Sequence, residues 1–135
     1  MLYKALAGED KDAVLFGAHF PADWAPVLSP NLDAIARGDY RGKSENEIRG
    51  SGYVVESLEA ALWCFLHADN FRDAILRAVN LGDDADTTAA VCGQIAGAYY
   101  GESGIPESWR QRLALCDLIV ELADRLWEKQ LGAST

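Results

Sequence analysis

The chain has 135 residues, of which 50% are hydrophobic and 24% charged, the balance of an ordinary globular protein. Its net charge of −9 argues against a nucleic-acid surface, because phosphate backbones are bound by clustered lysine and arginine. No apolar run approaches the roughly 18 residues of a membrane span, and the N-terminus lacks a signal-peptide pattern. We therefore expect one cytoplasmic domain, residues 1–135, with neither a nucleic-acid nor a membrane partner.

Residues 1–49 are expected to be largely irregular. Prolines at positions 21, 26 and 30 interrupt a segment whose apolar residues keep no long period. Within it, the pattern predicts a short helix over Asn31–Arg37, ended by Gly38, and one turn around Glu45–Ile48. The remainder, residues 50–131, is expected to be helical.

Two amphipathic helices are predicted next. The first follows Tyr53, and its apolar residues recur at the three- and four-residue spacing of one buried face. The second begins after Asn70, a favourable N-cap residue, and ends at Gly82. The stripe of the first is Val54, Val55, Leu58, Leu62, Phe65 and Leu66; that of the second is Phe71, Ala74, Ile75, Ala78 and Val79.

A third helix is predicted over Thr87–Tyr100, and an amphipathic closing helix over Leu113–Leu131. Gly93 and Gly97 fall on one face of the third helix, although glycine costs ~1 kcal/mol inside a helix. Another backbone is therefore expected to pack very close to that face. Since no alternating strand pattern appears, the fold class is predicted to be all-α.

The three cysteines and two histidines are expected to be structural. Cys64, Cys92 and Cys116 stand far apart among apolar residues, without the spacing of a zinc site. They are interpreted as free thiols, most simply buried ones. His19 and His67 have no partner at metal-ligand spacing.

The densest chemical signal is an acidic turn before the third helix. Asp83, Asp84 and Asp86 lie within four positions, followed by Thr87 and Thr88. Carboxylate and hydroxyl oxygens are hard ligands that suit Mg²⁺ or Mn²⁺. Helix capping is the alternative, since aspartate near a helix N-terminus is stabilised by the free N–H groups and the dipole. One cap accounts for one aspartate, not for three.

Two linked segments resemble the ADP-ribosylglycohydrolase family. Gly82–Ala90 (GDDADTTAA), with the small and aromatic residues that follow to position 101, resembles its C-terminal metal motif. Gly50–Trp63 (GSGYVVESLEAALW) resembles a second family segment at the expected separation. The resemblance covers about residues 48–104.

The resemblance implies an all-α enzyme with two Mg²⁺ or Mn²⁺ ions that removes ADP-ribose from modified side chains or related conjugates. It assigns Asp83 to the turn, because the family often has glycine there. It implies metal ligands at Asp84, Asp86 and Thr87, and an ADP-ribose cleft lined by Gly50, Ser51, Gly52 and Tyr53.

The family's N-terminal Thr-Asp-Asp metal segment has no counterpart in this sequence. Three ligands cannot fill the shells of two octahedral ions. The chain is therefore expected to be a partial, C-terminal version of the fold. Three alternatives stay open: a C-terminal fragment, one piece of a split enzyme that works with a separate N-terminal half or by self-association, or a degenerate member that no longer turns over. The alternative is a non-catalytic module that binds ADP-ribose or a partner protein. Glu56 and Glu59 lie near the cleft by sequence, and no general acid or base is identified.

Overall fold

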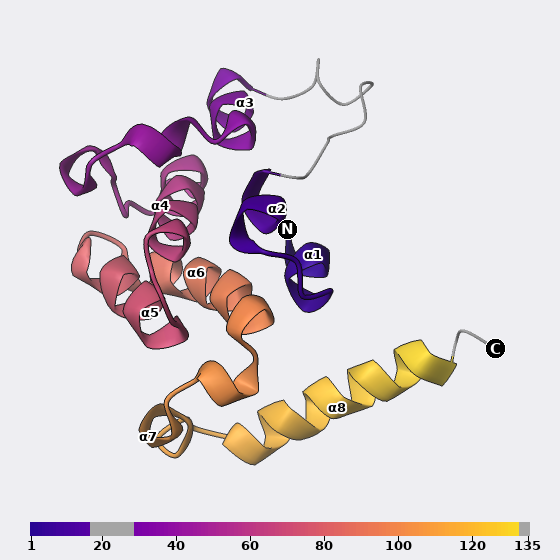
Figure 1. The fold of residues 1–135 in the computed structure, drawn as a ribbon. Coiled ribbons are helices and arrows are strands. Elements are labelled where there is room, and N and C mark those ends of the chain that lie inside the picture. The colour runs from indigo at the N-terminus through magenta and orange to yellow at the C-terminus, as the bar shows by residue number, and fades with distance from the viewer. Residues whose placement is uncertain (17–28, 133–135) are drawn as a thin grey trace. The chain divides into compact units, whose positions relative to one another are not determined.

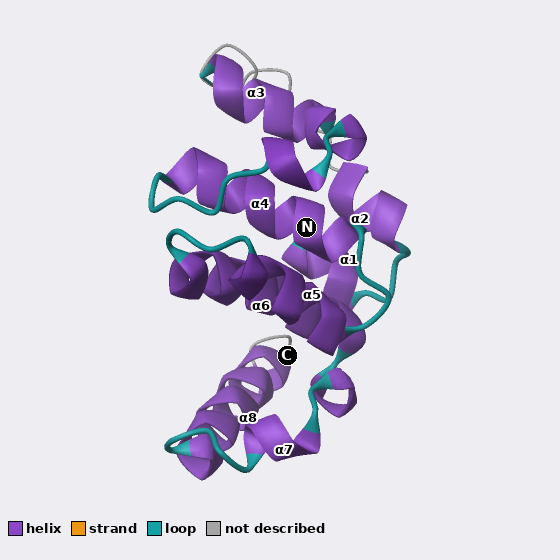
Figure 2. Ribbon diagram, turned by 90° about the vertical axis from the view of Figure 1, so that its left-hand side faces the viewer, coloured by secondary structure: helices purple, strands orange, loops and turns teal. Residues whose placement is uncertain are grey.

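A computed structural model describes residues 1–16 and 29–132 of the chain. Every regular element in those ranges is a helix, which confirms the all-α prediction (Figures 1 and 2). The chain forms two compact units, residues 1–104 and 105–135. Each unit is described by itself below.

The core of the first unit is built from three helices, α4 (Val54–Leu66), α5 (Phe71–Asn80) and α6 (Ala85–Tyr100). Helix α6 packs against both α4 and α5, as Figure 1 shows. The contacts are made largely by small side chains, which let helix axes approach closely. Those that are fully buried include Ala60, Ala61, Cys64, Ala74, Ala78, Cys92 and Ala96.

The buried face of α4 differs from the predicted stripe. Leu62 and Phe65 are buried as expected, but Val54 is 69% exposed. Ser57 and the alanines at positions 60 and 61 take the central place instead. The prediction weighted large apolar side chains, whereas close helix packing selects small ones.

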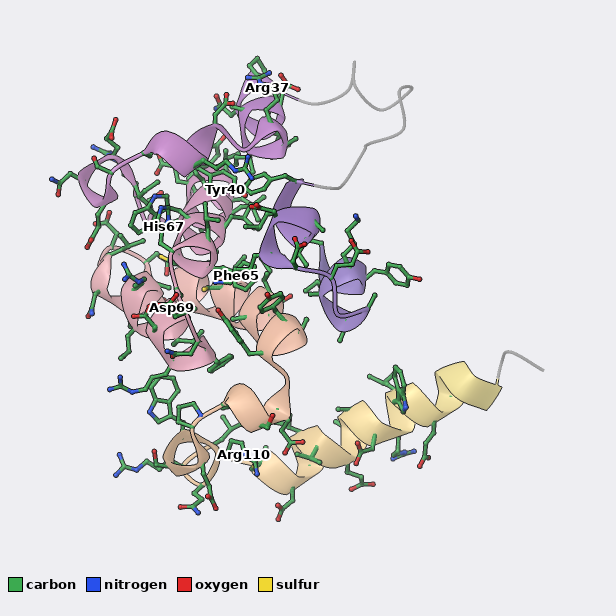
Figure 3. The ribbon with its side chains drawn as sticks, viewed as in Figure 1. Arg37, Tyr40, Phe65, His67, Asp69 and Arg110 are labelled. Atoms are coloured by element: carbon green, nitrogen blue, oxygen red, sulfur yellow. The ribbon has the colours of Figure 1, made fainter. Side chains whose placement is uncertain are left out.

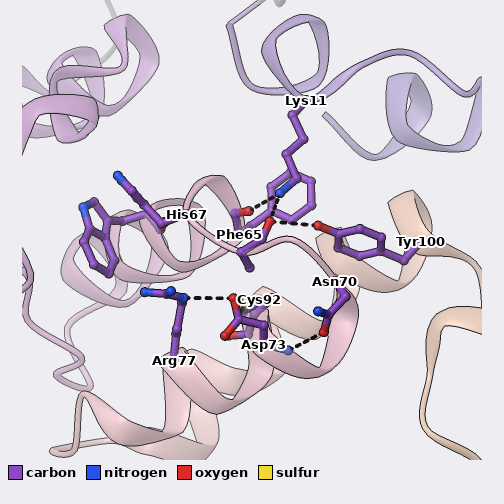
Figure 4. A network of polar contacts seen from close by, with 11 residues as sticks. Lys11, Phe65, His67, Asn70, Asp73, Arg77, Cys92 and Tyr100 are labelled. Atoms are coloured by element: carbon purple, nitrogen blue, oxygen red, sulfur yellow. Dashed lines mark hydrogen bonds and ion pairs between the residues drawn. The ribbon is translucent and has the colours of Figure 1, made fainter.

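Helix α5 starts as predicted, at an Asn70 N-cap whose side-chain oxygen accepts a hydrogen bond from the Asp73 N–H at 2.9 Å (Figure 4). The two glycines of α6 meet side chains of α5, not its backbone. A Cβ on Gly93 would lie 3.5 Å from the Ile75 Cδ1, and one on Gly97 3.9 Å from the Phe71 ring. These are ordinary contact distances, so the expectation of an unusually close backbone was wrong.

Residues 1–49 contain more regular structure than predicted. Helices α1 (Leu2–Leu6) and α2 (Lys11–Phe16) lie in the part expected to be irregular. Each is too short to show a hydrophobic period. The Asp10 side chain caps α2 by accepting from the Ala13 N–H at 2.8 Å. His19 and the prolines at 21 and 26 lie outside the described residues.

The predicted helix beyond that gap is present as α3 (Pro30–Arg37), and it ends at Gly38 with φ +78°. Two short 3-10 turns follow, η2 (Asp39–Gly42) and η3 (Glu45–Glu47), the second where a turn was expected. Tyr40, labelled in Figure 3, is 1% exposed, and its ring lies 5.9 Å from that of Phe16. This tyrosine therefore joins η2 to α2.

Lys11 ties α2 to the end of α4 (Figure 4). Its ammonium donates to the Phe65 carbonyl at 2.9 Å and to the Ala68 carbonyl, and it lies 4.9 Å from the centre of the Phe65 ring. The Tyr100 hydroxyl donates to the same Ala68 carbonyl at 3.0 Å. Free carbonyls at a helix C-terminus need such donors, so this cluster closes α4.

The first unit ends with the short turn η4 (Glu102–Gly104), and the second contains α7 (Glu107–Arg110) and α8 (Cys116–Gly132). The closing helix was predicted from Leu113, but Leu115 has φ +58°, a left-handed conformation that a helix cannot include. It therefore starts three residues later. None of the helices described is both long and apolar enough to cross a membrane.

Candidate metal and ligand site

The two sequence motifs, about thirty residues apart in the chain, meet in the first unit. The backbone N–H of Asp84 donates to the carbonyl of Gly50 at 2.8 Å. This bond joins the loop before α4 to the turn before α6. The predicted ligand-binding segment and the predicted metal segment therefore form one local structure.

The acidic turn depends on two residues with left-handed backbones. Gly82 has φ +78° and Asp83 has φ +51°. Aspartate tolerates this region better than most residues, and glycine tolerates it best. Asp83 is exposed.

The glycines of the first motif are needed because the second motif lies against them. A Cβ on Gly50 would lie 3.2 Å from the Gly82 carbonyl oxygen and 3.3 Å from the Thr88 hydroxyl. A Cβ on Gly52 would lie 2.8 Å from the carboxylate oxygen Oδ2 of Asp84. Larger residues at 50 or 52 would separate the segments or move the carboxylate.

Asp84 stands at the N-cap position of α6, yet its side chain makes no capping hydrogen bond. Helix capping therefore does not explain this residue. The pKa of Asp86 lies below its usual value. The largest cause is a hydrogen bond with the Asp84 carboxyl, followed by hydrogen bonds from the backbone N–H groups of Thr87 and Asp86. The two carboxyl groups are thus side by side, with Asp86 and Thr87 exposed in the first turn of the helix.

The loop of the first motif is held by its own side chains. The Ser51 hydroxyl donates to the Glu56 carboxylate and accepts from the Tyr53 N–H at 3.2 Å. Tyr53 is 56% exposed. The contact between Ser51 and Glu56 fixes the loop to the first turn of α4, and sequence spacing alone did not predict it.

Thr88 is a further residue of this region that sequence analysis did not assign. It is completely buried, and its hydroxyl has no hydrogen-bond partner among the described residues. An unpaired buried hydroxyl costs about 1–3 kcal/mol. The hydroxyl lies beside Gly50, directly behind the junction of the two motifs.

The donors present fit part of a site for a hard divalent cation. Asp84, Asp86 and Thr87 supply two carboxylates and a hydroxyl, the oxygen ligands that Mg²⁺ and Mn²⁺ prefer. In the described ranges, no group of three or more histidine, cysteine, aspartate or glutamate residues is placed to hold a metal ion by itself. The acidic turn therefore offers part of a ligand set, and its assignment as a metal site stays a prediction.

The other residues considered from sequence are structural. Cys64 and Cys92 are buried free thiols, and Cys116 is a half-buried one. His67 is exposed, and its Nδ1 lies 2.9 Å from the Trp63 carbonyl. Trp63 is buried, and its indole N–H donates to the Lys43 carbonyl at 2.9 Å. Of those in the first unit, neither His67 nor Trp63 is bonded to the acidic turn in the hydrogen bonds of the described residues.

A family model and the similar proteins all point to the same family. The sequence model described as ADP-ribosylglycohydrolase matches residues 1–134. The ADP-ribosylarginine hydrolase Tri1 of Pseudomonas putida is 46% identical over 128 residues, which cover 95% of this chain and 33% of that protein. Tri1 of Serratia proteamaculans is 54% identical over 93 residues, 69% of this chain and 25% of that protein.

A solved structure of similar fold also comes from this family. A chain of an ADP-ribosylglycohydrolase-related protein complex aligns with 90% of this chain at a TM-score of 0.77 and 39% identity, and 41% of that chain is covered. The present chain thus spans a third or less of the two curated relatives and under half of the solved chain. This coverage fits the expectation of a partial version of the fold.

Proposed function

The chain belongs to the ADP-ribosylglycohydrolase family, and from that premise we propose that it supplies one side of a metal-dependent site that hydrolyses ADP-ribose conjugates. The observation that carries the proposal is the hydrogen bond from the Asp84 N–H to the Gly50 carbonyl. It places the acidic turn directly against the loop assigned to ADP-ribose. Both relatives named above are called ADP-ribosylarginine hydrolases.

In this proposal the acidic turn holds the cation. Asp84 and Asp86 present adjacent carboxylates, and the Thr87 hydroxyl adds a third oxygen. Mg²⁺ or Mn²⁺ bound there would polarise the ribose hydroxyls and a water. In the net reaction the glycosidic bond breaks, the water oxygen joins the anomeric carbon, and the leaving group takes up a proton.

The loop Gly50–Tyr53 would bind the ADP-ribose. Glycines leave the backbone open to a diphosphate, and the exposed Tyr53 ring can cover a ribose. Because Ser51 is already bonded to Glu56 and to the Tyr53 N–H, little loop ordering is left to oppose binding.

The test is Mn²⁺ and ADP-ribose titration of the full chain by calorimetry. Asp84→Asn and Asp86→Asn should each weaken Mn²⁺ binding at least tenfold, since even the loss of a group that only orients a metal ligand costs about that much. Asp83→Asn, with its exposed side chain at the tip of the turn, is the matched control and should bind as the parent does. Equal Mn²⁺ binding by all four proteins would rule out the assigned ligands.

A second candidate is a module that binds ADP-ribose without turnover. The incomplete donor set among the described residues and the coverage of a third or less of the relatives favour it. Hydrolysis should be assayed on an ADP-ribosylated arginine peptide, with the chain alone and with a polypeptide carrying the family's Thr-Asp-Asp segment. ADP-ribose binding that persists in Asp86→Ala, with no turnover in either mixture, would select the binding module.

A further inference from the structure

An exposed arginine without a side-chain partner stands directly before the Gly50–Tyr53 loop. The chain has 21 acidic and 12 basic side chains, so carboxylates outnumber the cations that could pair with them. Among the described residues of the first unit, every lysine and arginine side chain except Arg49 and Arg72 makes an ion pair or a hydrogen bond. The engaged cations are Lys4, Lys11, Arg37, Arg41, Lys43 and Arg77.

The backbone fixes where Arg49 lies. Ile48, which precedes it, has an extended backbone and is only 6% exposed. Gly50, which follows it, is buried, and its carbonyl accepts the hydrogen bond from the Asp84 N–H. Arg49 is therefore anchored on both sides, one residue from the bond that joins the loop to the acidic turn, while its own side chain is exposed.

The loop that follows Arg49 holds further unused hydrogen-bond donors. The Tyr53 N–H is taken up by the Ser51 hydroxyl. The backbone N–H groups of Ser51 and Gly52, in contrast, make no hydrogen bond with any described residue. Successive N–H groups in a turn form a favourable site for an anion. Together with the Arg49 guanidinium they supply a set of free donors next to the acidic turn.

This donor set suits a diphosphate. A guanidinium binds phosphate oxygens by paired hydrogen bonds, and backbone N–H groups can take the remaining oxygens. The loop also needs a cation to hold such an anion, because carboxylates surround it. Glu56 is bonded to Ser51, and Asp84 lies against Gly52. Without Arg49 these like charges would oppose the approach of a diphosphate to the loop.

We propose that Arg49 binds the diphosphate of ADP-ribose, together with the N–H groups of Ser51 and Gly52. The inference rests on the proposed function, because it names the residue of that site which takes the charged part of the ligand. Arg49 then makes the loop select ADP-ribose over uncharged nucleosides. Arg72, the other unpaired arginine, lies on α5 outside both sequence motifs and has no such role.

The experiment titrates the full chain with ADP-ribose by calorimetry, and with adenosine by amide chemical shifts, both in the presence of Mg²⁺. Arg49→Gln should weaken ADP-ribose binding by about ten- to hundredfold, the effect of losing a charge-assisted contact. Adenosine, which carries no phosphate, should bind to this variant within about twofold of the parent. Arg72→Gln is the matched control and should bind both compounds as the parent does.

Two further measurements separate an ionic contact from a change in loop shape. Arg49→Lys keeps the charge but loses the paired hydrogen bonds, so its affinity for ADP-ribose should fall between those of the parent and Arg49→Gln. Raising the salt concentration from about 0.05 to 0.5 M should weaken ADP-ribose binding to the parent more than to Arg49→Gln, because salt screens an exposed charge.

ADP-ribose affinity that is unchanged in Arg49→Gln, or lowered equally in Arg72→Gln, would overturn the assignment. So would an equal loss of adenosine binding in Arg49→Gln, since the arginine would then act through the shape of the loop. In each of these cases the parent still binds ADP-ribose, and the proposed function stands. A parent chain that binds neither ADP-ribose nor Mn²⁺ would overturn the proposed function, and the role of Arg49 with it.

Discussion

The carboxylate of Asp84 lies where a side chain at position 52 would begin. A Cβ built on Gly52 would be 2.8 Å from Asp84 Oδ2, closer than such atoms normally approach. The obstacle is the far end of a side chain, so a methyl group at 52 would move the carboxylate and leave the fold in place. The geometry of the acidic turn is thus tied to the residue type at 52.

Gly52→Ala should therefore weaken Mn²⁺ binding while leaving stability nearly unchanged. We expect about a tenfold loss of affinity, the lower end of what losing a group that orients a metal ligand costs. The free energy of unfolding should change by less than about 1 kcal/mol. Calorimetric titration and urea unfolding measure the two effects. Gly42→Ala is the control, because nothing lies within 4 Å of a Cβ there; equal Mn²⁺ affinity in both variants would contradict the role given to Gly52.

Asp83 and Asp84 should respond oppositely to substitution. Asp83 holds a left-handed backbone with φ +51°, so Asp83→Ala should lower the free energy of unfolding by about 1 kcal/mol, and Asp83→Gly should not. Neither should change Mn²⁺ binding. Asp84→Asn should abolish most of that binding with little effect on stability, since the Asp84 side chain makes no capping bond. Loss of Mn²⁺ binding in Asp83→Gly would make Asp83 a ligand and refute the division of roles.

The buried hydroxyl of Thr88 gives a test that needs no metal. Thr88→Val keeps the shape and removes the unpaired hydroxyl, so the free energy of unfolding should rise by about 1 kcal/mol. Thr87→Val, at an exposed site, should stay within about 0.5 kcal/mol of the parent. Thermal or urea unfolding in the presence of a chelator measures both. A loss of stability in Thr88→Val would mean that the hydroxyl has a partner, such as a buried water.

Helix ends were predictable from the sequence where a single residue decides them. Asn70 caps α5, and Gly38 ends α3, because a short polar side chain or a left-handed glycine is enough. The start of α6 was placed two residues late, since Ala85 and Asp86 join the helix although Asp84 does not cap it. The left-handed Leu115 could not be foreseen, because no local rule favours leucine there.

The candidate site was predictable only through the family resemblance. Spacing alone left capping as an alternative for Asp84, and the Gly50 segment alone looked like an ordinary loop. Their contact depends on how α4 and α6 pack, which is decided by small residues such as Ala60 and Ala96. Hydrophobic periodicity gives little weight to alanine. Because it weights large apolar side chains instead, it also placed the exposed Val54 in a buried stripe.

The glycines of α6 should be replaceable by alanine. Gly93→Ala adds a methyl group 3.5 Å from Ile75 Cδ1, an ordinary contact, and removes a residue that costs ~1 kcal/mol in a helix. We expect the free energy of unfolding to rise by about 0.5–1 kcal/mol. Gly50→Ala is the contrasting variant, because its methyl would press on the Gly82 carbonyl and the Thr88 hydroxyl. It should lose about 1–3 kcal/mol, the usual cost of overpacking. If Gly93→Ala lost as much stability, the helices would be packed more tightly there than described.

The three thiols should divide into one reactive and two protected groups. Burial raises the pKa of both Cys64 and Cys92 to about 12, so at pH 8 both thiols stay protonated. Since the thiolate is the nucleophile, neither should react with a disulfide reagent while the chain is folded. Cys116 is only half-buried and should react. We expect one equivalent of fast labelling in the native chain and three in denaturant, with Cys116→Ser removing the fast equivalent. Fast labelling that survives in Cys116→Ser would show that the α4–α6 core opens readily.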